Sequence, residues 1–342
     1  MHALAALVLL GLAGCASQSR SLPVAAAPVA APVSETTQYY QDPALDAEQG
    51  MVESMEARQS VPSTVAFTAP PASTATVNYW PSDAPPTVSS SAIMVDARTG
   101  KVLFEKNADY PRPVASTQKL LTAMLVSERG NLQQKVTITE AATACEPTKL
   151  YLKAGERYTR YALLYAIMVR SANDAAASLA IDHSGSISAF GVAMTRKARS
   201  LGATRSWFAN PHGLPDPNQY SSARDMAIVA LAAYRDPVLR RMMATSQTTF
   251  QYEDGRQRVL TATNKLLARS TAYTGMKTGF TNASGRCLIS SATQGGRHII
   301  LVQLGGTRSV VFDDAARLLQ WQLRKGAGFS GYASTPGSEP GS

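Results

Sequence analysis

A serine and a lysine three residues apart, Ser116 and Lys119, begin an apolar helical pattern in the stretch PVASTQKLLTAML (113–125). Residues three apart share one face of a helix, so the hydroxyl and the amine can be neighbours. The free N–H groups at a helix N-terminus favour an oxyanion, and burial or a nearby cation lowers a lysine pKa. The pair indicates a nucleophile and its base, although about one Ser-x-x-Lys is expected by chance in a chain of this length.

Two other short motifs supply groups that such a nucleophile needs. Ser171 and Asn173, in RSANDAAA, stand at an expected break between helices, where a hydroxyl and an amide can face a cleft. Lys277, Thr278 and Gly279, in MKTGF, lie on a strand pattern. The lysine is the candidate second cation, and the glycine lets a substrate backbone approach closely. Each motif alone is typical of a helix cap or a strand end, but together they predict one site.

The elements that must position these motifs follow a simple order. Strand patterns cover 92–107 on both sides of a DARTG turn, and helical patterns follow near 116, at 157–180 with a break at the second motif, at 187–203 and at 222–237. Strand patterns return as a hairpin at 248–260 and as single strands at 274–280, 285–296 and 297–307, before a last helix at 313–326. The order predicts an α+β fold, an antiparallel sheet flanked by helices with a mostly α-helical subdomain.

The three motifs together resemble the signature of penicillin-recognising serine enzymes. The stretches 113–125, FANPHGLPDPNQYSSARDMA (208–227) and GMKTGFTNASGRCLISSATQGG (275–296) are similar to D-alanyl-D-alanine carboxypeptidases, the low-molecular-mass penicillin-binding proteins. The resemblance covers residues 89–325 and implies the penicillin-binding-protein/β-lactamase-like transpeptidase fold. It also implies a serine D,D-carboxypeptidase that removes the terminal D-alanine from peptidoglycan stem peptides through an acyl-enzyme, with β-lactams as covalent inhibitors.

The resemblance gives each residue of the first two motifs a catalytic role. Ser116 is expected to attack the carbonyl between two D-alanines, and Lys119 to accept its proton. Ser171 would pass a proton to the leaving amine, under the electrostatic influence of Lys277. Asn173 would bind the substrate backbone and orient the base.

The remaining groups bind the substrate. Thr278 and Lys277 would face its terminal carboxylate, and the backbone N–H groups of Ser116 and Phe280 would form an oxyanion hole, in which losing one donor costs about 3–4 kcal/mol. His212, in NPHGLP, is interpreted as a loop-shaping residue because Pro211, Gly213 and Pro215 surround it, and by resemblance the family needs no histidine for its chemistry. The resemblance implies neither a metal nor an organic cofactor.

One position departs from the family's pattern. Many relatives carry an arginine before the aromatic residue that leads into the last helix, where it meets the substrate carboxylate. Here Val311 precedes Phe312, and Arg308 is the nearest substitute. Without that charge, preference for a free C-terminus weakens, so a D,D-endopeptidase that cleaves cross-links is the main alternative. A β-lactamase, which would need an acidic deacylation loop, and a catalytically silent wall-binding module are less favoured.

The N-terminal residues indicate export. An apolar run from Ala3 to Gly14 is too short to span a bilayer but fits the core of a secretory signal. Leu12 to Cys15, LAGC, resembles the bacterial lipobox, which implies a signal peptide over 1–14 and a lipid on Cys15; a plain signal peptide with a chance cysteine is the alternative. We expect a protein of the bacterial cell envelope that faces the periplasm and is anchored through Cys15. Ala16 favours the outer over the inner membrane, again by resemblance.

Composition separates the ends of the chain from its middle. Residues 15–88 are dominated by Ala, Pro, Ser, Thr and Val, which predicts a disordered tether, and the tail 326–342 is expected to be disordered too. From Ala16 to Val88 we count two basic and seven acidic residues, a net of −5, so the rest of the +9 chain carries +14. This charge suits anionic wall polymer or a membrane surface. The chain has no nucleic-acid recognition motif, so nucleic acid is not an expected partner.

Two cysteines fall in the expected folded domain, 89–325. Cys145 and Cys287 could pair in an oxidising compartment, but we favour buried free thiols.

Overall fold

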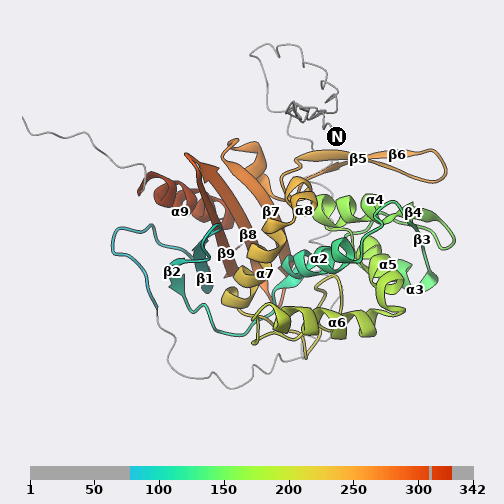
Figure 1. The fold of residues 1–342 in the computed structure, drawn as a ribbon, viewed down its shortest axis with the longest axis horizontal. Helices are drawn as coiled ribbons and strands as arrows, with labels where there is room; N and C mark the ends of the chain where they lie inside the picture. The colour runs from blue at the N-terminus through green and yellow to red at the C-terminus, as the bar shows by residue number, and fades with distance from the viewer. Residues whose placement is uncertain (1–77, 308–309, 326–342) are drawn as a thin grey trace, which may run out of the picture. The chain divides into compact units, whose positions relative to one another are not determined.

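A five-stranded antiparallel sheet organises the part of the chain that the computed structural model describes, residues 78–307 and 310–325. Its strand order is β2-β1-β9-β8-β7, so strands from both ends of the folded region pair in one sheet (Figure 1). The strands are β1 (Ser91–Asp96), β2 (Val102–Lys106), β7 (Tyr273–Thr281), β8 (Gly285–Gln294) and β9 (Arg297–Gly306). The predicted α+β class, with its antiparallel sheet, is confirmed.

Helices cover both faces of this sheet. Alternate side chains of a strand point to opposite faces, and here Met94 and Leu301 pack with α9 (Val311–Lys325), whereas Ile93 belongs to the cluster on the other face. Figure 1 shows α9 on one side of the sheet and α7 (Ala223–Arg235) on the other, and α7 contacts β1 and β9. The sheet is therefore buried on both sides.

A mostly helical region lies beside α7 and is built around α2, which is buried along most of its length. Its helical elements are the 3₁₀ turn η1 (Ala115–Gln118), α2 (Lys119–Arg129), α3 (Glu140–Thr143), α4 (Arg160–Tyr165), the π-helical turn η2 (Ala166–Arg170), α5 (Asn173–Ser184), α6 (Ile187–Ser200) and α8 (Pro237–Met243). Two hairpins, β3 (Lys135–Thr137) with β4 (Arg157–Thr159) and β5 (Gln247–Gln251) with β6 (Gln257–Thr261), and the 3₁₀ turn η3 (Lys265–Ala268) complete the described elements.

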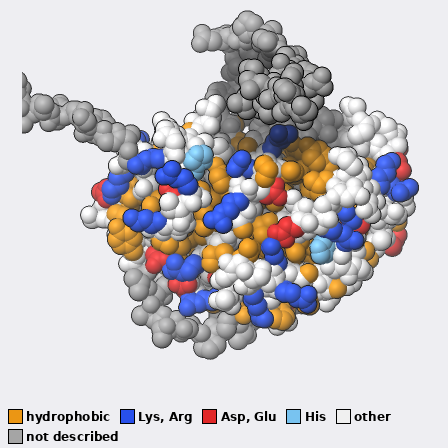
Figure 2. All heavy atoms as spheres, in the orientation of Figure 1, with side chains coloured by type: hydrophobic (Ala, Val, Ile, Leu, Met, Phe, Trp, Pro, Cys, Tyr) orange, Lys and Arg blue, Asp and Glu red, His pale blue; other side chains and the backbone are white. Residues whose placement is uncertain are grey.

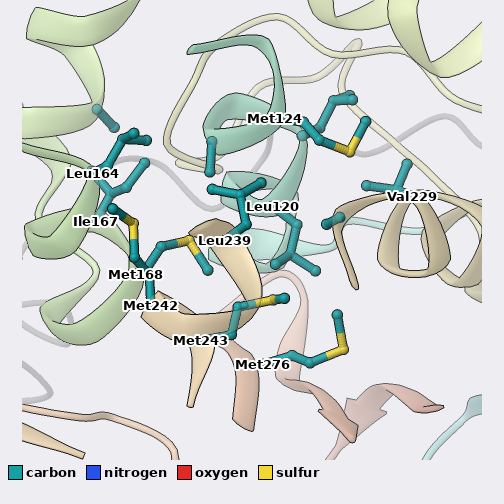
Figure 3. Close-up of a cluster of buried hydrophobic side chains, with 14 of the residues drawn as sticks. Leu120, Met124, Leu164, Ile167, Met168, Val229, Leu239, Met242, Met243 and Met276 are labelled. Atoms are coloured by element: carbon teal, nitrogen blue, oxygen red, sulfur yellow. The ribbon is translucent and has the colours of Figure 1, made fainter. Parts of the chain in front are cut away.

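A methionine-rich cluster joins the elements that carry the three motifs. Figure 3 shows Leu120 of α2 near the methionines Met168 of η2, Met242 and Met243 of α8 and Met276 of β7, all of them buried. Unbranched methionine side chains fill irregular gaps where several elements converge. The cluster thus fixes the start of α2, the end of η2 and the strand β7 relative to one another.

Local sequence signals explain where these helices begin. The predicted cap Ser222 accepts from the Asp225 N–H, as expected at the start of α7. The helix expected near Ser116 starts instead as the 3₁₀ turn η1, whose first residue, Ala115, has a left-handed backbone with φ 47°. No sequence pattern predicted α8, which begins at Pro237, although Asp236 caps it.

The folded region begins earlier than the predicted boundary at residue 89. The Glu105 N–H donates to the Tyr79 carbonyl at 2.8 Å, and the Trp80 ring lies 4.5 Å from that of Phe104. Tyr79 and Trp80 lie in a proline-rich stretch, and the composition of that stretch predicts disorder. Residues 78–88 therefore belong to the domain and not to the tether.

Several other expectations fall outside the described residues: the signal peptide, Cys15, the tether up to residue 77, Arg308 and the tail 326–342. Cys145 and Cys287 are buried free thiols, as favoured above. Among the helices that the structure describes, none has the length and apolar character needed to cross a bilayer.

The surface carries the basic charge expected for this part of the chain. Figure 2 shows Lys and Arg side chains predominating over Asp and Glu on the face drawn, with several gathered at the lower edge, where Figure 1 places α6. Several cations on other elements form ion pairs, among them Arg224 with Asp109 at 2.9 Å. The net positive surface therefore coexists with local pairing.

Candidate active site

The Ser-x-x-Lys motif forms the junction between η1 and α2. Ser116 lies in the 3₁₀ turn, half-buried, and Lys119 is the first residue of α2, fully buried. Their side chains meet, with 2.7 Å between Lys119 Nζ and Ser116 Oγ. The first motif therefore has the geometry of a nucleophile in contact with a base.

The amine of Lys119 lies among three oxygens. Ser116 Oγ, Asn173 Oδ1 and the His212 carbonyl are each 2.7 Å from Nζ. A neutral amine has two hydrogens for the amide and the carbonyl and one lone pair for the serine hydroxyl, so this set can hold the uncharged form. Burial, and secondarily the charge of Lys277, hold the pKa of Lys119 well below its usual value. The environment favours a lysine that can accept a proton.

The second motif lies at the break that the sequence predicts. Ser171 ends η2 with a left-handed backbone, φ 67°, and α5 begins at Asn173. The Asn173 N–H donates to the Thr148 carbonyl at 2.8 Å, which ties the break to the loop before β4. A non-glycine residue with positive φ stores strain that the surrounding structure must hold. The break turns the Ser171 hydroxyl and the Asn173 amide toward the two lysines.

Lys277 joins this break to strand β7. Its side chain is fully buried and donates to Ser171 Oγ and to the Thr278 carbonyl, both at 3.0 Å. Burial lowers the pKa of Lys277 to about 7. The two lysines thus contact the two ends of one three-residue segment, Lys277 at Ser171 and Lys119 at Asn173.

Strand β7 lies directly against the nucleophile turn. A Cβ at Gly279 would lie 2.8 Å from the Ser116 nitrogen, so only glycine allows this approach. Because β7 is an edge strand of the five-stranded sheet, the backbone groups on its outer side are not used by β8. This edge can pair with an extended peptide beside Ser116. Phe280 directly follows Gly279, the residue that touches the nucleophile turn.

Thr278 and Phe280 flank this glycine in β7. The Thr278 hydroxyl is 2.6 Å from that of Thr263, and the Arg286 guanidinium stacks on the Phe280 ring at 4.4 Å.

Val311, the first residue of α9, is only 2% exposed and packs in the apolar cluster between α9 and the sheet, so it presents no group that could replace an arginine.

The structure adds a loop that the sequence analysis did not place in the site. Residues of η1 and α2 bind three successive carbonyls of this loop: Gln118 of η1 donates to that of residue 210, and Thr122 and Lys119 of α2 donate to those of Pro211 and His212. Burial lowers the pKa of the His212 imidazole to about 3, so it is uncharged. His212 contributes its backbone carbonyl to the site. Every residue has such a carbonyl, so the residue type does not predict this role.

A second residue that the sequence analysis missed is Asp174. Its buried carboxylate accepts from the N–H groups of Leu150, Leu152 and Ala175, and burial raises its pKa. It therefore fastens the loop around Leu150 to the residue next to Asn173. An acidic residue in the first turn of the helix after Ser-Ala-Asn was the available signal.

The site as a whole presents a hydroxyl, two lysines of lowered pKa, an amide and an open strand edge. Within residues 78–307 and 310–325, no group of three or more His, Cys, Asp or Glu side chains could hold a metal ion. The arrangement can deprotonate an alcohol and bind an extended peptide next to it.

Comparison with known proteins relates this geometry to one family. Residues 81–308 match the sequence profile of the D-alanyl-D-alanine carboxypeptidases. The chain is 32% identical to the carboxypeptidase DacF of Bacillus subtilis over 222 residues, covering 64% of this chain and 57% of that protein. It is 34% identical to DacC of Escherichia coli over 255 residues, 71% and 63% of the two chains. The match thus spans less than two thirds of either relative.

Other relatives are matched over more of their length. A D-alanyl-D-alanine endopeptidase of Escherichia coli is 33% identical over 243 residues, which cover 69% of this chain and 78% of that protein. Among solved structures, a D-alanyl-D-alanine carboxypeptidase from Mycobacterium tuberculosis superposes with a TM-score of 0.68 at 29% identity, covering 72% and 94% of the two chains.

Substitution of Gly213 by alanine tests the loop that supplies the His212 carbonyl. A Cβ at Gly213, where φ is +88°, would lie 2.2 Å from the Ala115 carbonyl oxygen, so the loop must move away from the nucleophile turn. We expect acylation of Ser116 by a fluorescent penicillin to slow by about 100-fold, the cost of a misplacement near 1 Å.

Gly202→Ala is the matched control, because Gly202 also has positive φ, +95°, but nothing lies within 4 Å of its Cβ position. Equal acylation rate constants for the two variants would show that the close approach of the loop is not required.

Substitution of Lys277 by methionine tests whether burial lowers the pKa of this lysine. The pKa of Lys277 is about 7 in the folded chain, against about 10.4 for an unfolded lysine. Between these values the unfolded chain binds a proton that the folded chain does not, so Lys277 destabilises the fold as the pH falls. Relative to wild type, the free energy of unfolding of Lys277→Met should rise by about 3 kcal/mol from about pH 9.5 to about pH 6.5.

Denaturant titrations at the two pH values measure this difference. Lys265→Met, at an exposed lysine of η3, is the control and should show no such trend. A stability difference between Lys277→Met and wild type that stays constant with pH would mean that Lys277 keeps an ordinary pKa.

Proposed function

Since the chain belongs to the D-alanyl-D-alanine carboxypeptidase family, we propose that it is a serine D,D-carboxypeptidase that removes the terminal D-alanine from peptidoglycan stem peptides. One observation carries the proposal: the Lys119 amine, 2.7 Å from the Ser116 hydroxyl, is fully buried and has a lowered pKa. An edge strand that can bind an extended peptide lies beside this pair.

Acylation starts from the neutral amine. As Ser116 Oγ attacks the carbonyl carbon between the two D-alanines, its proton moves to Lys119 Nζ, which keeps its bonds to Asn173 Oδ1 and the His212 carbonyl. The negative charge that develops on the carbonyl oxygen would be bound by the backbone N–H groups of Ser116 and Phe280, where β7 meets the nucleophile turn.

Collapse of the tetrahedral intermediate breaks the C–N bond. The leaving D-alanine amine takes a proton from the Ser171 hydroxyl, which Lys277 contacts at 3.0 Å, and Ser171 is reprotonated from Lys119. Water then attacks the ester on Ser116, with Lys119 again accepting the proton, and Lys119 returns this proton to Ser116 Oγ as the acyl–oxygen bond breaks and the shortened peptide leaves. A β-lactam would acylate the same serine and block it.

Cleavage of cross-links, a D,D-endopeptidase activity, is the second candidate. Carboxypeptidases of the family commonly bind the free carboxylate with an arginine, whereas here the position holds buried Val311, and Thr278 is paired with another hydroxyl, that of Thr263. Neutral hydroxyls discriminate less between a terminal carboxylate and a continuing peptide than a guanidinium does.

Two substrates separate these activities. Wild type should bind a fluorescent penicillin covalently and release D-alanine from a pentapeptide, and Ser116→Ala should do neither. Mass spectrometry of products from the pentapeptide and from a cross-linked dimer gives the ratio of the two reactions. Cleavage of the dimer alone would replace the carboxypeptidase assignment by the endopeptidase, and an unlabelled wild-type protein would contradict both.

We further propose that the protein is a lipoprotein of the bacterial cell envelope that faces the periplasm, with the outer membrane favoured. The support is in the sequence: the apolar run up to Gly14, the lipobox-like LAGC ending at Cys15 and Ala16 after it. Stem peptides lie in this compartment, so an anchored hydrolase would be held within reach of its substrate.

Substitution of Cys15 by serine tests the anchor. The variant has no thiol for acylation, so we expect it to leave the membrane fraction or to remain as unprocessed precursor, whereas wild type incorporates labelled palmitate. Cys145→Ser is the control and should fractionate like wild type, since that thiol is buried in the domain. Unchanged membrane association of Cys15→Ser would contradict the lipid anchor.

A further inference from the structure

A groove of about 360 Å³ lies between the loop before β4 and the β5–β6 hairpin. Figure 1 shows this hairpin next to β4, and the two are joined by a 2.8 Å bond from the Arg157 N–H to the Glu253 carboxylate. The groove is lined by Leu150, Tyr151, Tyr252, Arg256, Gln257 and Arg258. None of the catalytic steps described above uses it.

Hydrogen bonds connect the wall of this groove to the catalytic break. The Asp174 carboxylate accepts from the Leu150 N–H at 2.9 Å, and the neighbouring Asn173 N–H donates to the Thr148 carbonyl at 2.8 Å. From the other side, the Tyr252 hydroxyl donates to the Leu150 carbonyl at 2.8 Å. The wall of the groove is thus hydrogen-bonded to the segment that carries Asn173 and Asp174.

The chemistry of the lining selects for an anion with an alkyl chain. Two arginines and two tyrosines face the groove, and no acidic side chain lines it. Arg256 stacks on the Tyr252 ring at 4.6 Å, which holds its planar guanidinium in place. Guanidinium groups bind carboxylates through two parallel hydrogen bonds, and aromatic rings pack on methylene groups.

Two further features favour a ligand in the groove. Tyr151 is 65% exposed and holds a left-handed backbone, φ 60°, a strained conformation that is typical of functional positions. Arg256 pairs with Asp254 at 2.7 Å, but both side chains are largely exposed, 59% and 39%. An exposed pair of this kind contributes little stability, so an incoming carboxylate can take its place at low cost.

We propose that this groove binds a side-chain carboxylate of the stem peptide, on the residue that precedes the two D-alanines. The inference rests on the proposed function: the acyl part of the substrate would pass Asn173, and Leu150 in the groove wall is hydrogen-bonded to Asp174, the next residue. Arg256 and Arg258 would bind the carboxylate, with Tyr151 and Tyr252 against the alkyl chain that carries it.

Two peptides test the proposal. Both end in D-Ala-D-Ala and differ only in the preceding residue, which carries a side-chain carboxylate in one and its primary amide in the other. We expect wild type to prefer the carboxylate form by about tenfold in kcat/KM, the value of a charge-assisted hydrogen bond. The double variant Arg256→Gln, Arg258→Gln should reduce this ratio to within about twofold.

Arg324→Gln is the control, because this exposed arginine lies in the last turn of α9 on the other face of the sheet, and its ratio should equal that of wild type. Equal cleavage of both peptides by wild type, or a ratio that survives the double substitution, would overturn the proposal. A ratio lowered as much by the control would overturn it as well, since the effect would then be one of overall charge.

Binding to Ser116→Ala, measured by calorimetry with the same two peptides, separates this inference from the proposed function. Tighter binding of the carboxylate form that depends on Arg256 and Arg258 supports the groove even if wild type releases no D-alanine. Hydrolysis of both peptides with equal binding supports the function and rejects the groove. Absence of binding by either peptide rejects the groove.

Discussion

The structure depends on burying two lysine amines within one site. A buried ammonium is costly, and a second one nearby makes it more so, so the fold must either supply oxygens or keep the amines neutral. Lys119 receives three oxygens at 2.7 Å, from the nucleophile, from the break before α5 and from the loop ending at Gly213. Each comes from a different segment, so the lysine at the start of α2 holds the whole site together.

Close backbone approaches make this convergence possible. Gly213 brings its loop onto the nucleophile turn, and Gly279 brings β7 onto the Ser116 nitrogen, with no room for a side chain at either point. Ala115 and Ser171, in contrast, accept left-handed conformations without being glycine. Their strain is tolerated because the methionine-rich cluster and the bonds from α2 fix the surrounding backbone. The residues that bring the reacting groups together are therefore also residues at which the backbone is tightly packed or strained.

The site extends beyond the reacting atoms through hydrogen bonds of the backbone. Asp174, next to Asn173, fastens the loop around Leu150, and that loop forms one wall of the groove. A change in this loop would reach Lys119 through only two hydrogen bonds, from Asn173 N–H to the Thr148 carbonyl and from Lys119 to Asn173 Oδ1. Binding of the acyl part of a substrate and positioning of the base are thus physically connected.

The sequence by itself determined the five strands of the main sheet, the β5–β6 hairpin, most of the helices, the break at Ser171 to Asn173 and the three motifs, because periodicity, caps and residue types act over a few neighbours. It did not predict the short strands β3 and β4, and β4 (Arg157–Thr159) occupies the start of the stretch predicted as helical. It missed the 3₁₀ turn at Ser116, α8, the aromatic contact of Trp80 and the roles of Asp174 and the His212 carbonyl. Only the tertiary structure decided that the lysines face one segment and that a backbone carbonyl completes the base's surroundings. These features arise between residues up to 106 positions apart, such as Lys277 and Ser171, and local pattern carries no information on such contacts.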